Sequence, residues 1–178
     1  MMALFSRMLR AAKFDPAVYE EVEADPKATG QAMTVVILSA VAAGLGSLGH
    51  PELGGNVGVL ITTFSALFSW IFWAYVTYFI GIRFFKEPQT QTDPGELLRT
   101  IGFSSAPGVI RILGALPGTT IPVFGIAALW MFIAMIVAVK HSFDFASSWK
   151  AAQVVLVGWL IQSLVLTTIL IIPVLLKP

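Results

Sequence analysis

The chain alternates between long apolar stretches and short polar segments. Five stretches are long enough, or nearly so, to cross a bilayer, since about 20 helical residues rising about 1.5 Å each cover about 30 Å of hydrocarbon. Backbone groups in lipid must be hydrogen-bonded within their own segment, which favours helices. The pattern therefore predicts an all-α polytopic bundle of transmembrane helices, with spans at residues 31–48, 57–82, 97–116, 121–139 and 151–176.

The third predicted span differs from the others because it contains charges and helix breakers. Arg99 lies near its start, Arg111 near its end, and Pro107 and Gly108 between them. Proline removes a helical hydrogen bond and glycine loosens the next turn, so a kink or break is expected at Pro107. A half-buried helix at the membrane interface is the alternative to a full crossing.

The distribution of lysine and arginine favours five crossings. With the N-terminus in the cytoplasm and the C-terminus outside, the outer loops 49–56 and 117–120 contain no basic residue, as the positive-inside rule requires. Four spans would place the loop 140–150 outside and break this pattern. The nine of eleven basic residues that lie inside are Arg7, Arg10, Lys13, Lys27, Arg83, Lys86, Arg99, Lys140 and Lys150.

Residues 1–30 are predicted to form a cytoplasmic N-terminal segment. Acidic residues separate the basic start from the first apolar run, which is unlike a cleavable signal peptide. An apolar face with basic residues beside it predicts a helix lying at the membrane interface, and a frayed start is the alternative. That face consists of Leu4, Phe5, Met8, Leu9 and Ala12, with Arg7, Arg10 and Lys13 beside it.

Three Asp-Pro dipeptides predict helix starts, because Asp caps the free amides and Pro fits the first turn. They are Asp15-Pro16, Asp25-Pro26 and Asp93-Pro94, and Glu96 occupies the capping-box position after the last of them. The acidic helical stretch after the first dipeptide is the predicted contact face for a partner. This face comprises Tyr19, Glu20, Glu23 and Asp25.

The composition agrees with a membrane protein. The chain is 57% apolar and 12% charged, with a mean hydropathy of +0.84, whereas soluble domains are about 45–50% apolar and about 25% charged. These values argue against a soluble enzyme, a disordered tail and a nucleic-acid-binding domain. The absence of cysteine excludes disulfides and thiolate metal sites.

Residues suited to catalysis or metal binding are few. Each of the two histidines has one carboxylate close by in the sequence, which falls short of the three or four ligands of a metal site. Ser104 and Ser105 are adjacent at membrane depth, but neither an intramembrane histidine nor a GxSxG motif accompanies them. We therefore predict that the protein is not an enzyme and has no catalytic residues, metal site or cofactor.

Arg111 is the one informative charge within a span. It lies about fourteen residues into the third span, which places it roughly 21 Å along a straight helix, in the outer third. Its side chain either snorkels to the outer headgroups, pairs with Glu52 in the outer loop, or serves a ligand or lipid headgroup. Gly102, Pro107 and Gly108 are the neighbouring candidates for a structural or functional role.

Small residues at spacings of three and four let helices approach closely in lipid. They serve either the bundle's own core or contact with another membrane protein or a second copy of the chain. These residues are Ala40, Ala43, Gly44 and Gly46, then Gly54 with Gly58, and Ser65 with Ser69.

The segment GFSSAPGVIRILGALPG, followed by IPVFGIAALWMFIAMIVAVKHSFDFASSWKAAQVVLVGWL, resembles the Yip family (Ypt/Rab-GTPase-interacting proteins), in particular its prokaryotic members. The resemblance covers about residues 31–170. It implies a multi-pass protein of the bacterial cytoplasmic (inner) membrane, with five spans, no enzyme activity and no cofactor. The matching features are Gly102, Pro107, Pro117, Pro122, Trp130 and the segment 145–151 with Lys150 and Ala151.

Eukaryotic members of this family bind prenylated Rab GTPases and act in vesicle formation between the ER and the Golgi. Their cytoplasmic motif runs Asp-Leu-Tyr-Gly-Pro. Residues 15–19 of this chain read Asp-Pro-Ala-Val-Tyr and lack the Gly-Pro, so the resemblance does not extend to binding of a Rab-type GTPase.

Two functions follow from the sequence. The first is a non-enzymatic membrane scaffold, partner-binding or lipid-organising factor, with the bilayer as its surroundings and no nucleic acid as partner. The alternative is a small transporter or channel whose path passes Arg111 and the break at Pro107. The spans contain no acidic residue, which argues against proton or sodium coupling.

Overall fold

The computed structural model describes residues 2–49 and 56–175, and all regular secondary structure in this part of the chain is helical. The all-α prediction is therefore confirmed. The α-helices are α1 (Met2–Ala12), α2 (Pro16–Ala24), α3 (Ala28–Gly46), α4 (Asn56–Ile80), α5 (Pro94–Ser104), α6 (Thr120–Ser142) and α7 (Ser148–Leu175). Two 3₁₀ helices, η1 (Ser47–Gly49) and η3 (Ala106–Ala115), and one π-helical segment, η2 (Gly81–Phe85), complete the order.

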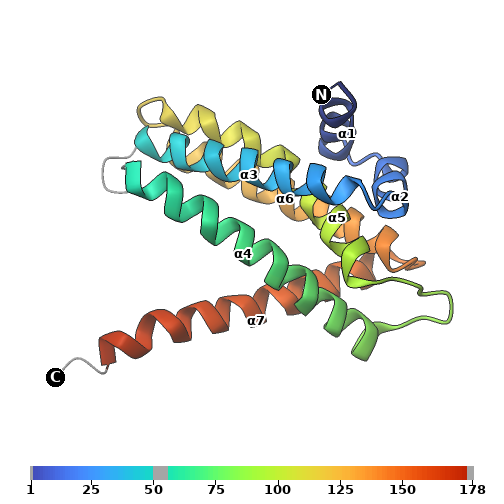
Figure 1. Cartoon of the computed structure of the whole chain (residues 1–178). Coiled ribbons are helices and arrows are strands. Elements are labelled where there is room, and N and C mark those ends of the chain that lie inside the picture. Colours follow the sequence, from blue (N-terminus) through green and yellow to red (C-terminus); the bar gives the residue numbers. More distant parts are fainter. Residues whose placement is uncertain (1, 50–55, 176–178) are drawn as a thin grey trace.

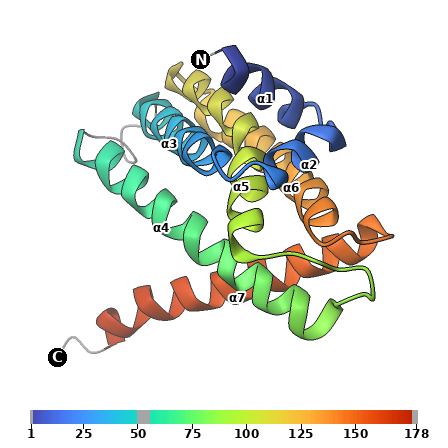
Figure 2. The ribbon, with the colours of Figure 1, turned by 45° about the vertical axis from the view of Figure 1, so that its right-hand side comes forward.

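The long helices form one bundle, with the two short N-terminal helices at one end (Figure 1). Within the described residues, four helices are long and apolar enough to cross a membrane: Ala28–Gly49, Thr63–Phe85, Thr120–Ser142 and Ser148–Val165. Figure 2 shows that α7 crosses α4 and then diverges from the rest of the bundle toward its C-terminal end. The chain is an integral membrane protein.

Local capping sets the starts of two of these helices. Asp15 accepts a hydrogen bond from the Ala17 amide (3.0 Å), and α2 begins at Pro16 as predicted. A complete capping box between Asp93 and Glu96 starts α5. At Asp25-Pro26 the helix begins later than predicted. The Asp25 side chain accepts from the Lys27 amide in the preceding turn, and α3 begins at Ala28.

The third predicted span, residues 97–116, is not one continuous α-helix. The α-helix ends at Ser104, and the chain continues as the 3₁₀ helix η3, in which Pro107 is the second residue. Pro107 has no amide hydrogen and disfavours α-helical backbone in the residue before it, which explains why the α-helix stops just upstream. The expected break is present as a change of helix type, two residues before Pro107.

The segment α5–η3 runs parallel to α3 and in close contact with it. Glycines make this approach possible, since a Cβ added at Gly102 would lie only 2.7 Å from the Cβ of Ala32 and one at Gly46 would overlap the carbonyl oxygen of Arg111. The facing positions advance together along both segments: Ala32 with Gly102, Ser39 with Gly108, Gly46 with Gly114, and Gly49 with Gly114 and Ala115.

The small residues of α3 therefore serve the chain's own packing. Ala40, Ala43, Gly44 and Gly46 are all buried, which leaves none of them for contact with a partner helix. Gly54 lies outside the described residues.

Replacing Gly46 by alanine tests this packing. We expect Gly46→Ala to destabilise the fold by about 1–3 kcal/mol, because overpacking forces the backbones apart. The matched control is Gly125→Ala, where an added Cβ meets nothing within 4 Å and helix propensity favours alanine by about 1 kcal/mol. The measurement is loss of the helical circular dichroism signal on heating in a mild detergent. Equal midpoints for the two variants would contradict the packing described here.

Candidate functional site

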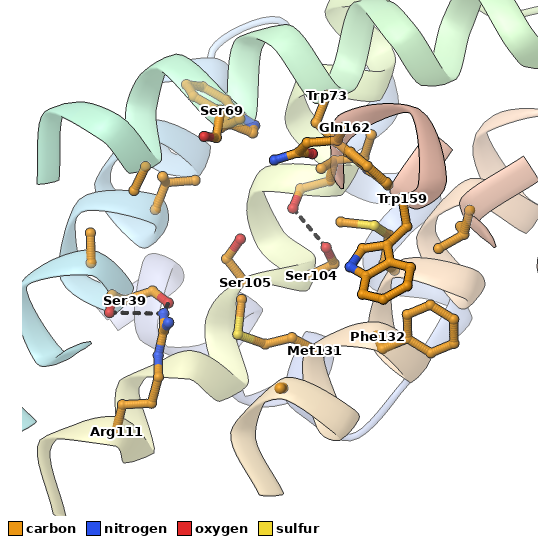
Figure 3. A pocket seen from close by; sticks show the side chains of 18 residues that line it. Ser39, Ser69, Trp73, Ser104, Ser105, Arg111, Met131, Phe132, Trp159 and Gln162 are labelled. Atoms are coloured by element: carbon orange, nitrogen blue, oxygen red, sulfur yellow. Dashed lines mark hydrogen bonds between the residues drawn. The ribbon is translucent and has the colours of Figure 1, made fainter. Parts of the chain in front are cut away.

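A cavity of about 370 Å³ lies inside the bundle, between α3, α4, α5–η3, α6 and α7 (Figure 3). Its lining residues come from the middle of each segment: Ser39 of α3, Ser69 of α4, Met131 of α6, Gln162 of α7, and Ser105 at the junction of α5 and η3. The middle of a membrane-spanning helix lies near the centre of the bilayer. The cavity is therefore at membrane depth.

The guanidinium of Arg111 points into this cavity. Its Nη2 donates to the backbone oxygen (3.0 Å) and to Oγ (2.6 Å) of Ser39, and its Nε donates to the Gly108 carbonyl (3.0 Å). The ring of Phe124 lies 5.9 Å from the guanidinium carbon. Within the described residues, Arg111 forms no ion pair with a carboxylate.

The direction of this side chain bears on one of the three roles considered for Arg111, namely snorkelling. Its backbone lies beside Gly46 at the end of α3, whereas its guanidinium reaches back to Ser39 in the middle of α3. Side chains of helical residues tilt toward the helix N-terminus, which here means into the bundle. Arg111 thus turns away from the nearer membrane surface instead of snorkelling to it. Glu52, its other suggested partner, lies outside the described residues.

Several neutral polar groups of the cavity are left without partners. In the part of the chain that the structure describes, the side chains of Ser69, Ser105 and Gln162 form no hydrogen bond to another residue. The buried indole Nε1 of Trp73 likewise has no acceptor there. Unsatisfied polar groups at membrane depth cost several kcal/mol each, so this cavity is suited to a polar occupant.

The cavity opens between α6 and α7. On the side of α3 and α4, the lining residues Ser39, Trp70 and Trp73 are buried. On the α6–α7 side, Ala128 is exposed and Trp159 is 56% exposed although both line the cavity. The adjoining surface of α7 is apolar and exposed, so the opening faces hydrocarbon. That surface includes Leu156, Leu160, Ile161 and Leu164.

A second polar region lies at the end of the bundle where α2 packs. Tyr19 is completely buried there, and its hydroxyl donates to the Ala11 carbonyl (3.2 Å). Tyr19 is therefore part of the core and not of an accessible contact face, because α2 packs against α5 and α6 on that side. Of the predicted partner face, Glu20 is the most exposed, with its carboxylate 3.4 Å from Nδ1 of His141.

The basic residues of α1 also have internal partners. Arg7 contacts the carboxylates of Glu21 (2.8 Å) and Asp25 (3.2 Å). Arg10 contacts Asp15 (2.7 Å) and Glu21 (2.6 Å). These pairs connect α1 to the segment around α2, so both arginines are engaged within the chain.

The carboxyl of Glu23, in the same region, has a strongly raised pKa. The guanidinium of Arg99 donates to the backbone carbonyls of Val22 and Glu23, which fixes α2 on α5. Burial, followed by the negative charges of Glu96 and Asp144, raises the pKa of the Glu23 carboxyl to about 8, against the smaller opposing effect of Arg99.

A family model of the Yip1 domain matches residues 13–170 of the chain. The chain belongs to the Yip1 domain family. Yip proteins form a membrane protein family and are not known as enzymes, in agreement with the apolar helices described above. The match begins in the turn after α1 and includes α2 and most of α7. A search of curated proteins and a search of solved structures each gave no match.

The structure of this Yip1 domain brings some of the sequence candidates together and separates others. Gly108 lies directly against Ser39 and the Arg111 guanidinium, where a side chain would displace both. Pro107 is the second residue of η3 and directly precedes Gly108. Gly102 instead packs on Ala32 and does not line the cavity.

Sequence reasoning missed the other polar residues of the cavity in this Yip1 domain. Ser39, Ser69 and Gln162 come from three different helices, and each lies within a predominantly apolar run. One signal could have found them, namely that each lies near the middle of its predicted span.

The pKa of Glu23 predicts how the stability of this Yip1 domain depends on pH. The folded-state pKa of about 8 lies above the ordinary value of 4.5, so the folded protein binds more protons than the unfolded chain between these values. The free energy of unfolding should therefore fall as the pH rises from about 4.5 to about 8. We expect Glu23→Gln to remove this part of the slope and to stabilise the protein at pH 8.

The control for this prediction is Glu21→Gln. Hydrogen bonds from Arg7 and Arg10 lower the pKa of Glu21, so its charged form stabilises the fold above its ordinary pKa. Glu21→Gln should destabilise the protein at pH 8, whereas Glu23→Gln should stabilise it. Thermal unfolding midpoints measured across this pH range would show both effects. A change of the midpoint in the same direction for both variants at pH 8 would refute the raised pKa of Glu23.

Proposed function

We propose that this Yip1 domain is a non-enzymatic, lipid-organising membrane protein whose central cavity accepts part of a membrane lipid. The observation that carries this proposal is the inward-pointing guanidinium of Arg111, held at membrane depth in a cavity that opens toward hydrocarbon. A polar cavity with a lateral opening suits a molecule that is polar at one end and apolar at the other. Lipid organisation is favoured over partner binding because Tyr19 and Asp25 of the suggested contact face are used within the chain.

We further propose that the chain crosses the membrane five times, with α5–η3 as the third crossing. Eleven α-helical and ten 3₁₀ residues cover roughly 35 Å in total, at about 1.5 and about 2.0 Å per residue. The parallel alignment of α5–η3 with α3 supports the same depth for both. The distribution of basic residues favours a cytoplasmic N-terminus, and the resemblance to prokaryotic family members favours the bacterial cytoplasmic membrane.

Single cysteines test the third crossing, because the chain contains no cysteine of its own. Gln91 and Pro117 are exposed on either side of α5–η3, and Ala146 is exposed after α6. In intact cells, a membrane-impermeant maleimide should label Pro117→Cys, whereas Gln91→Cys and Ala146→Cys should react only after permeabilisation. Labelling of Gln91→Cys and Pro117→Cys from the same side would exclude a third crossing.

Filling the opening of the cavity tests the lipid-organising function. Ala128→Phe places a ring at the exposed edge of the cavity, and we expect it to reduce the lipid retained by the purified protein, measured by native mass spectrometry. The control is Leu38→Phe, a similar change on exposed α3 surface outside the cavity and away from α7, which should retain lipid as the parent does. Equal retention by the two variants would place the bound lipid elsewhere.

A transporter or channel is the second candidate function. The break between α5 and η3 meets the cavity at Ser105, in the middle of the bundle, and broken helices at the membrane centre often form transport sites. Flux of ions or small solutes into liposomes containing the pure protein, abolished by Ala128→Phe, would favour this candidate over lipid organisation.

A further inference from the structure

The charge of the cavity restricts what it can bind. Arg111 donates from Nη2 to Ser39 and from Nε to Gly108. Its Nη1 forms no hydrogen bond to any residue that the structure describes. A guanidinium at membrane depth needs an anion, because an unpaired charge there is costly. Arginine presents its donors in a planar fork that matches the oxygens of a phosphate. The site therefore favours a phosphate group.

The size of the cavity indicates which part of a molecule enters it. A volume of about 370 Å³ accommodates roughly a dozen groups of the size of water, at about 30 Å³ each. This is enough for a phosphate with a small headgroup and far too little for two acyl chains. The chains of a lipid would leave through the opening beside Trp159 and lie along the exposed apolar surface of α7.

The neutral polar groups define the remainder of the headgroup. Ser69, Ser105 and Gln162 provide hydroxyl and amide groups that have no partner within the described part of the chain. None of the described residues lining the cavity is acidic. A hydroxylated headgroup would find hydrogen-bond partners here, whereas the ammonium of a zwitterionic headgroup would find no counter-charge.

From these observations we infer that the cavity binds the headgroup of an anionic phospholipid, with the phosphodiester on the Arg111 guanidinium and headgroup hydroxyls on the facing serine and glutamine side chains (Figure 3). This inference rests on the proposed lipid-organising function and names its ligand. A phosphodiester carries one negative charge, which balances the single cation of the site. A phosphatidylglycerol-like lipid meets each of these requirements.

The test compares binding of short-chain phosphatidylglycerol and phosphatidylcholine to the full chain in detergent, by native mass spectrometry. We expect the protein to prefer phosphatidylglycerol by about tenfold or more. Both lipids carry the phosphodiester, but the ammonium of phosphatidylcholine brings a second cation into a cavity that already holds Arg111 and has no acidic lining residue among those described. Arg111→Gln should abolish the preference, and Arg111→Lys should retain part of it. Arg83→Gln, which removes an exposed arginine outside the cavity, should leave the preference unchanged.

Gln162→Glu provides a second variant that leaves the contacts of Arg111 with Ser39 and Gly108 intact. It introduces a carboxylate into the cavity in a nearly isosteric side chain, so the anionic preference should fall to about the level of Arg111→Gln if both lipids enter this site. This variant keeps the inference testable if Arg111→Gln does not fold. An unchanged preference in Gln162→Glu would overturn the assignment of the site.

The remaining outcomes separate this inference from the proposed function. Equal binding of the two lipids, lost in Ala128→Phe, would overturn the anionic assignment and leave the lipid-organising function standing. No binding of either lipid would overturn both. Displacement of phosphatidylglycerol by glycerol 3-phosphate at equal concentration would show that a water-soluble phosphate, and not a lipid, is the ligand. Failure of glycerol 3-phosphate to compete supports the lipid as the source of the phosphate.

Discussion

The close approach of α3 to the segment α5–η3 is the contact on which the rest of this structure depends. Two backbones can come this near only where side chains are missing, and Gly46 and Gly102 provide such places at opposite ends of the contact. Between them, Gly108 leaves room for the guanidinium of Arg111 to reach Ser39. The glycines therefore both allow the third segment to pack against α3 and leave room for the guanidinium that lines the cavity.

The change from α-helix to 3₁₀ helix has two consequences for the cavity. A 3₁₀ helix rises faster per residue, so ten residues of η3 cover as much depth as about thirteen residues of α-helix. The short segment can thus accompany α3 along its length. The change of helix type also falls at Ser105, in the middle of the bundle, where a continuous α-helix would have allowed its hydroxyl to bond a carbonyl of the preceding turn.

Much of this fold was predictable from the sequence because the signals for it are local. Span positions follow from runs of apolar residues, and the start of α5 follows from Asp93 and Glu96 within one turn. The burial of Tyr19 and the direction of Arg111 were not predictable, because each depends on residues far away in the chain: α2 packs on α5 and α6, and Ser39 lies 72 positions from Arg111. The cavity was missed for the same reason, since its polar residues are spread over α3, α4, α5–η3 and α7.

The surroundings of the cavity favour the proposed site for lipid over a path for ions. An ion path needs polar groups that continue to water at both ends, whereas here the polar side chains cluster at mid-depth and the opening lies beside Trp159 on apolar surface. Ion coupling would also need a carboxylate, and none of the described residues lining the cavity supplies one. A fixed cation, partnerless neutral groups and an exit into hydrocarbon are together the requirements of an amphiphile with an anionic headgroup. The same polar groups that would be costly in an empty apolar bundle thus become favourable once a lipid headgroup satisfies them.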